Sequence, residues 1–315
     1  MKQYTHAWLA FKAIERLEKT VLTTENRKYA DSLITWFKTN RDGVIKGAWY
    51  PDLVIKDMAN SHVLKFIPAD QGSNEFSNLP SNYRIYEAGK QSPLYKHFYS
   101  VDRHDNLPER CEALAHSVID NLKMQESEEK GSPLSPTDNH VATILFMLSH
   151  YVADAHVPFH CDGRSFSSGC NLHGHVEGEW DDEIRKYYGI DSQTGRFYYN
   201  PEGYPLLTAD NNYSSSFLKL VDDALDNREF KITWGNNNTN VHDFMYAICQ
   251  FSYLLSYRFV PAGYDETNVT LNNWQNLPGQ SPAFGDLSVM VFTDAIDSIA
   301  RVWLRTWRRY VKWTQ

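Results

Sequence analysis

The segment HVATILFMLSHYVADAHVPFH, residues 140–160, decides the fold because it joins an apolar helix to regularly spaced histidine and carboxylate side chains. Its first half is apolar on nearly all sides, which predicts a helix at the centre of the molecule. His150 and Asp154 are four residues apart, so both project from one face of that helix. Pro158 cannot continue a helix interior, and we expect the chain to turn there and redirect His160.

Helical periodicity continues on both sides of this segment. Alternating strand patterns are scarce, and no internal repeat is present. Loops rich in Tyr, Gly, Asn and Pro occupy 189–212 and 260–285, and loops of that length often shape a binding site. The sequence predicts one all-α domain over residues 1–315, a multi-helix domain with long loops around a cleft. The other expected helices cover 6–17, 25–39, 106–124, 173–188, 213–228, 241–259 and 286–313.

The composition narrows the class of protein. A chain of 315 residues can bury a substantial core, and an aromatic content of 14% predicts a core or cleft rich in Trp and Tyr. The net charge of −8 argues against binding duplex DNA through phosphate contacts alone. Cys111, Cys161, Cys170 and Cys249 lack CxxC spacing, and we interpret them as free thiols. Cys161 and Cys170 flank one loop and would bridge only in an exported protein.

The first residues, MKQYTHAWLAFKAIERLEK, enter an amphipathic helix directly and lack the features of a signal peptide. This start favours a cytoplasmic protein, or a secreted or periplasmic one if a leader has been replaced. No stretch approaches the roughly 18 apolar residues that suggest a membrane span. No feature indicates a protein partner, and we expect a monomer.

A second group of candidate ligands follows in CNLHGHVEGEW, residues 170–180. His173 and Glu177 are four residues apart, and so are His175 and Glu179. A His and carboxylate pair at this spacing lets one helix offer two metal ligands, although a single pair is more often an ordinary polar contact. The sequence alone leaves both registers open.

Upstream candidates complete the set. The segment GAWYPDLVIKDMANSH, residues 47–62, carries Asp52 and His62, and His6 lies in the first expected helix. Each residue by itself is unremarkable. Together with the later pairs they form a set of nitrogen and oxygen donors without any cysteine, so a metal site built from them would not be a structural site rich in cysteine.

The order and spacing of these residues resemble the superfamily of trinuclear-zinc phospholipases C and single-strand-specific nucleases of fungi and plants. His150, Asp154 and His160 match its central H-x-x-x-D-x-x-x-x-x-H motif without a gap. His173 and Glu177 match the following H-x-x-x-[DE] motif. The resemblance extends from residue 6 to about residue 182 and implies an all-α fold.

The resemblance also implies three zinc ions. The first would be held by Asp52, His62, His150 and Asp154. The second would be held by His160, His173 and Glu177. The third would be held by His6 and Asp154, with the amino group and carbonyl of the first residue. In the family that residue is a Trp exposed by removal of a leader, whereas here Met1 stands five residues before His6, and Lys2 disfavours removal of Met1.

The implied activity is zinc-dependent hydrolysis of phosphate esters, in which Asp52 and Asp154 would be the catalytic carboxylates. Three divalent cations create a local positive field that attracts a phosphodiester. A glutamate at position 177 is typical of the phospholipases C, whereas the nucleases usually have an aspartate there. The NLH sequence before it and His156 are more similar to the nucleases. A phospholipase C acting on a phospholipid headgroup is favoured. The alternatives are a single-strand-specific endonuclease or 3'-nucleotidase and a non-catalytic helical zinc-binding protein.

Several residues are left without an assigned ligand role. His156 and His175 are interpreted as spare histidines. The aromatic segments 187–204 and 48–50 would stack a base, line a headgroup pocket or simply pack the loops. The remaining histidines have no partner at ligand spacing: His97, His104, His116, His140 and His242.

Overall fold

The chain is predominantly helical, as expected from its sequence, in a computed structural model that describes residues 1–20, 22–57, 59–68, 99–101, 105–129, 131–208, 212–231 and 240–313. The helices are α1 (Gln3–Lys19), α2 (Thr24–Val44), α4 (Leu107–Ser127), α5 (Asp138–Ala155), α6 (Pro158–Cys161), α7 (Leu172–Tyr187), α8 (Phe217–Asp226), α9 (Val241–Phe259) and α10 (Phe284–Trp313). The shorter elements are η1 (Ile45–Trp49), η2 (Pro51–Ile55), η3 (Ala59–His62), η5 (Tyr213–Ser215), β1 (Phe66–Pro68) and β2 (Tyr99–Val101).

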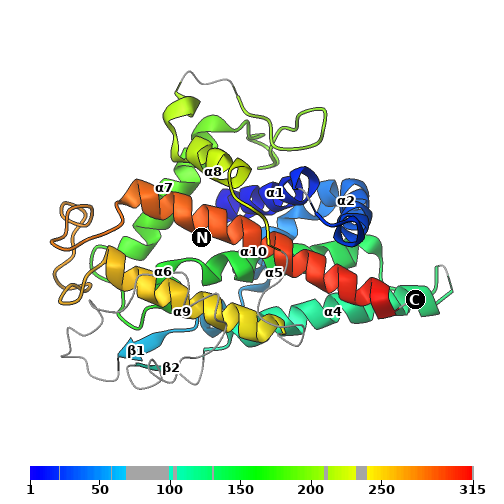
Figure 1. The fold of residues 1–315 in the computed structure, drawn as a ribbon, viewed down its shortest axis with the longest axis horizontal. Coiled ribbons are helices and arrows are strands. Elements are labelled where there is room, and N and C mark those ends of the chain that lie inside the picture. The colour runs from blue at the N-terminus through cyan, green and yellow to red at the C-terminus, as the bar shows by residue number, and fades with distance from the viewer. Residues whose placement is uncertain are drawn as a thin grey trace.

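Helix α5 is the centre of the fold. It packs against η1, α2, α4 and α10, and every residue from Ile144 to Ala155 is buried. Figure 1 shows α9 and α10 as two long helices that run in opposite directions across the face nearest the viewer, with α5 between them. The central position expected from the apolar residues of 140–155 is therefore confirmed, because a helix that is apolar all round is stable only when other elements cover all its sides.

Aromatic side chains fill much of the core. Trp8, Trp180 and Trp303 are fully buried. The aromatic segment 187–204 joins this core through Phe197, whose ring lies edge-on to Tyr4 at a centroid distance of 5.9 Å. This segment could have stacked a base, lined a headgroup pocket or packed the loops, and in the structure it packs against α1.

The ends of three helices set the directions of the candidate ligands. Thr137 caps α5, because its hydroxyl accepts the His140 N–H at 3.2 Å. Helix α5 ends at Ala155 and α6 begins at Pro158, so the chain breaks where proline was expected to break it. Asn171 caps α7 from a left-handed conformation at φ 48°.

A close approach between η1 and α5 brings a backbone carbonyl to the site. A Cβ on Gly47 would lie 2.7 Å from the Thr143 carbonyl oxygen, so only glycine allows η1 to sit this close to α5. The next residue, Ala48, thereby places its carbonyl oxygen 2.8 Å from His150 Nδ1.

A buried ion pair fastens the first helix to the last. Arg16 on α1 donates from Nε to Asp297 on α10 at 2.8 Å, and its Nη1 donates to the Leu225 carbonyl at 2.6 Å. Paired and hydrogen-bonded on several sides, this guanidinium avoids the cost of an isolated buried charge. The contact fixes α1, which carries Met1 and His6, relative to the rest of the bundle.

Some features differ from the sequence expectations or extend them. The antiparallel pair β1–β2 spans three residues a strand, too short for an alternating pattern to be visible. All four cysteines are free, so a bridge between Cys161 and Cys170 is absent. None of the described helices combines the length and the apolar character that crossing a membrane requires.

Candidate metal centre

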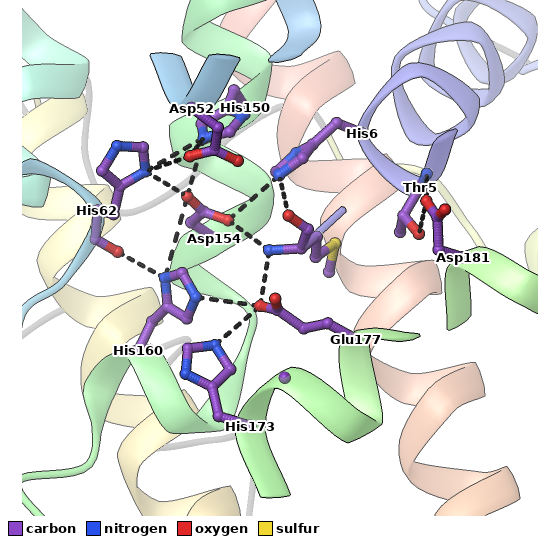
Figure 2. A network of polar contacts seen from close by, with 12 residues as sticks. Thr5, His6, Asp52, His62, His150, Asp154, His160, His173, Glu177 and Asp181 are labelled. Carbon is purple, nitrogen blue, oxygen red and sulfur yellow. Dashed lines mark hydrogen bonds and ion pairs between the residues drawn. The ribbon is translucent and has the colours of Figure 1, made fainter. Parts of the chain in front are cut away.

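Nine residues expected from the sequence as metal ligands gather at one place between α1, α5, α7 and the 45–62 segment. Figure 2 shows the labelled histidines of this set with Asp52, Asp154 and Glu177 pointing toward one another from different elements, with Asp154 in the middle. Within the described residues, three groups have ligand atoms within 4.8 Å of one another: His6 with Asp52 and His150, His62 with His150 and Asp154, and His160 with His173 and Glu177. Buried His and Asp donors therefore lie at metal-binding distances.

The group of His62, His150 and Asp154 joins α5 to η3. His62 Nδ1 lies 2.9 Å from Asp154 Oδ2 and 3.1 Å from His150 Nε2. His150 Nε2 and Asp154 Oδ2 are 3.2 Å apart, as their shared helix face predicts. Zinc bonds of about 2.0–2.1 Å in a tetrahedron place ligand atoms roughly 3.3–3.4 Å apart, close to these three separations.

Asp52 stands at the open side of this group. Its Oδ1 lies 3.6 Å from His150 Nε2 and 3.8 Å from His62 Nδ1, and the side chain is 43% exposed. Asp52 also belongs to the group with His6 and His150. Asp52 is thus the most solvated carboxylate of the cluster and faces both the buried donors and water.

The second group is built by the turn after α5 and the first turn of α7. His173 Nε2 lies 2.8 Å and His160 Nε2 3.2 Å from Glu177 Oε1. The expected break at Pro158 is what lets His160 face α7 instead of continuing along α5. This group contains the three residues that the resemblance implies for the second zinc.

A further set of donors, outside the grouping above, lies at the start of α1. The Met1 amino nitrogen lies 3.1 Å from Asp154 Oδ1 and 2.7 Å from Glu177 Oε1. His6 Nε2 lies 3.1 Å from the Met1 carbonyl oxygen and 3.5 Å from Asp154 Oδ1. The two oxygens of Asp154 therefore serve different neighbours, Oδ2 toward His62 and His150 and Oδ1 toward Met1 and His6.

Asp181 on α7 holds the start of α1 in this position. Its Oδ1 accepts the backbone N–H groups of Tyr4 at 2.8 Å and Thr5 at 3.1 Å. Helix α1 has no cap from its own Lys2, so a carboxylate from a distant helix satisfies these donors and complements the positive helix end. Sequence reasoning missed Asp181, since nothing local marks a cap supplied from 176 residues away.

Backbone and hydroxyl partners orient the imidazoles from outside. His150 Nδ1 pairs with the Ala48 carbonyl at 2.8 Å, and His160 Nδ1 pairs with the His62 carbonyl at 2.7 Å. His173 Nδ1 lies 3.2 Å from the Ser167 hydroxyl. Because a carbonyl needs a donor, Nδ1 of His150 and His160 carries the proton and Nε2 keeps a free lone pair, the arrangement of metal-ligating histidines.

At His6, His160, Asp154 and Glu177 the electrostatics favour the protonation states that metal ligands need. His62 is an exception, because Asp154 raises its pKa although burial lowers it. Burial lowers the pKa of His6 well below its ordinary value, and burial also lowers the pKa of His160. Burial would raise the pKa values of Asp154 and Glu177, but the Met1 amino group and neighbouring histidines hold both well below their ordinary values. Neutral imidazoles and ionised carboxylates are the forms that bind metal.

The amino group of Met1 supplies the cation that these carboxylates hold. Burial opposes its charge, yet Asp154 and Glu177 raise its pKa to about 11. His6 Nδ1, on the far side of the ring, is buried and has no hydrogen-bond partner among the described residues. Two buried carboxylates therefore surround a single buried ammonium, which leaves excess negative charge at the site. This excess and the neighbouring imidazoles make the donor set suitable for divalent cations.

The cluster lines an open cavity of about 480 Å³. Asp52, His62 and Asp154 form one wall, and His160, His173 and Glu177 form another. A cavity of this size accommodates a small ligand or a headgroup, and its polar groups converge on one region. The cluster is therefore reachable by a substrate and not sealed in the core.

The remaining candidates lie apart from the cluster. His175 faces Glu179 at 3.7 Å and lies edge-on to Trp274, so the alternative register points away from the other donors. His156 is buried, its Nε2 has no hydrogen-bond partner in the described part of the chain, and burial beside Arg228 lowers its pKa to about 3. None of the cluster groups includes His116, His140 or His242. His97 and His104 lie outside the described residues.

No protein-family model matches the chain, and neither the curated proteins nor the solved structures contain a match.

Proposed function

We propose that this protein is a zinc-dependent hydrolase of phosphodiesters of the phospholipase C type. The observation that carries the proposal is the position of Asp154. Its Oδ2 faces His62, its Oδ1 faces the Met1 amino group, and Glu177 lies nearby against His173. Imidazole and carboxylate donors at tetrahedral spacing suit zinc better than magnesium or calcium, which prefer oxygen alone. The family resemblance of the motifs supports the same assignment.

The cluster residues would hold zinc in the three groups described above. Bound zinc supplies Lewis acidity toward phosphoryl oxygens and makes water acidic enough to react near neutral pH. Asp52, the solvated carboxylate, orients a water molecule at the cavity side and accepts its proton. The buried pairs of His150 with Ala48 and His160 with His62 keep the donors fixed, so that little reorganisation is needed during the reaction.

The same cluster would serve a single-strand-specific nuclease, and the surroundings of the cavity favour the phospholipase. Recognition of single strands relies on aromatic rings that stack on bases. Phe159 is the only six-membered aromatic ring among the described residues that line the cavity, and the aromatic segment 187–204 packs on α1 instead. A scaffold protein without turnover would need neither an open cavity nor the exposed carboxylate of Asp52.

The test is hydrolysis of a soluble chromogenic phosphodiester, followed by parallel assays on phosphatidylcholine and single-stranded DNA. We expect turnover that a chelator abolishes and added zinc restores, with phosphatidylcholine preferred to DNA. Binding of zinc without hydrolysis of any phosphodiester would make the protein a zinc-binding scaffold. Hydrolysis that survives complete removal of metal would contradict the proposal.

The third zinc is expected to depend on the free amino group of Met1. Extending the chain by a few residues before Met1 removes the charged terminus from Asp154 and Glu177, and a peptide nitrogen is a poor ligand. Elemental analysis should show the third zinc lost while the other two remain. A matched extension at the C-terminus should leave the zinc content unchanged. Three zinc ions in the N-terminally extended protein would show that the amino group is not a ligand.

A further inference from the structure

An exposed aliphatic run borders the metal cavity. Leu53, Val54 and Ile55, here called the aliphatic rim, follow Asp52 directly in η2 and are 54%, 63% and 45% exposed. Single exposed apolar residues are ordinary, but three consecutive ones beside a cluster of charged ligands form a patch of the kind that marks an interaction site. Since Asp52 lines the cavity, whatever the rim contacts lies next to the metal centre.

The rim is held in place by its neighbours. Element η2 is a single π-helical turn, a rare form that often occurs at functional sites, and its Pro51 is buried. Beyond the turn, Asp57 donates its N–H to the Pro51 carbonyl at 2.9 Å. The Asp57 carboxylate accepts the Tyr151 hydroxyl at 2.5 Å and pairs with Arg110 at 3.2 Å. The rim is thus tied to α4 and α5 at its base while its side chains face solvent.

Two lysines accompany the rim at the mouth of the cavity. Lys56 comes directly after Ile55 and is exposed, and Lys65 is half-buried on another part of the cavity wall. Neither ammonium group is engaged in an ion pair within the described ranges. Aliphatic side chains with adjacent cations match a lipid surface, where acyl chains lie beneath a layer of phosphate groups.

We propose that the aliphatic rim inserts into a phospholipid surface, with Lys56 and Lys65 against lipid phosphates, and so presents those phosphates to the metal cavity. This inference rests on the proposed function, since it names how that site meets its substrate. The net charge of −8 opposes adsorption driven by charge, so insertion of the rim must supply most of the binding. A single-stranded nucleic acid fits this edge less well, because aliphatic side chains offer no ring for base stacking.

The test compares the native chain with Leu53→Ser/Val54→Ser in sedimentation with phosphatidylcholine vesicles. A chelator keeps the lipid intact, and circular dichroism confirms that each protein is helical. We expect the native chain to co-sediment in high salt as well as low salt, because apolar insertion is not screened. The double variant should bind roughly tenfold more weakly or worse, from the loss of two inserted side chains.

Leu134→Ser is the matched control, because Leu134 is a leucine that at 66% is more exposed than Leu53 and does not line the cavity. It should bind vesicles as the native chain does. With zinc restored, the double variant should keep its turnover of a soluble chromogenic phosphodiester and lose turnover only on vesicles. This second measurement separates failure of the rim from failure of the proposed hydrolase.

Three results would overturn the inference while leaving the hydrolase in place. They are absence of native binding to phosphatidylcholine, equal binding by the double variant, and binding that disappears in high salt. A native chain that binds a single-stranded oligonucleotide but not vesicles would assign this edge to nucleic acid instead.

Discussion

Asp154→Asn is expected to abolish phosphodiester hydrolysis and to deplete zinc. The carboxylate is buried at the junction of two donor groups, with Oδ2 at 2.9 Å from His62 and Oδ1 at 3.1 Å from the Met1 amino nitrogen. An amide keeps one oxygen but loses the negative charge and turns a nitrogen toward one of the two groups. Removing a residue that only orients a metal ligand lowers metal affinity or activity by about 10–100-fold. Removing a ligand itself should therefore lower activity by more than about a hundredfold.

Asp182→Asn is the control for this variant, because Asp182 is an exposed carboxylate on α7 outside all three groups. Its activity and zinc content should match those of the native chain. Circular dichroism of the Asp154 variant excludes loss of fold as the cause. A folded Asp154→Asn protein with full activity would refute the assignment of a shared carboxylate.

Glu177→Gln is expected to remove the second zinc, whereas Glu179→Gln is expected to leave it. Glu177 Oε1 lies within 3.2 Å of both His160 and His173, whereas Glu179 is 53% exposed and faces only His175 among the candidate histidines. The two carboxylates sit on the same helix two residues apart, so the pair forms a close comparison. Zinc content and phosphodiester turnover are measured for both variants.

The two possible registers of α7 give opposite results in this comparison. If His173 and Glu177 are the ligands, only the Glu177 variant loses metal and activity, by at least about tenfold in turnover. If His175 and Glu179 were the ligands, the Glu179 variant would be the inactive one. Equal zinc content in both variants would exclude either pair as a zinc site.

Much of the helical framework follows from local sequence. Helix α9 spans Val241–Phe259, the range that its periodicity predicts. Helix α8 begins at Phe217 instead of 213, because the Ser216 hydroxyl caps it and the residues before form a separate short turn. Periodicity and caps are properties of neighbouring residues, and they are visible before any tertiary contact forms.

The candidate site is predictable only where its residues share a helix or match the family motifs. The pairs His150 with Asp154 and His173 with Glu177 follow from helical spacing. The contact between His150 and the Ala48 carbonyl spans 102 residues and requires Gly47 at a close approach of two elements. Such contacts depend on how helices pack, which a single sequence does not encode locally. The aliphatic rim likewise became visible only from the exposure of η2.

The central claim is that Asp154 joins two zinc sites beside a third at Glu177. Anomalous X-ray diffraction at the zinc edge, on crystals of the zinc-loaded chain, tests it most directly. Three peaks are expected: one among His62, His150 and Asp154, one among His160, His173 and Glu177, and one among Met1, His6 and Asp154. Crystals of zinc-loaded protein without an anomalous peak among these residues would contradict it.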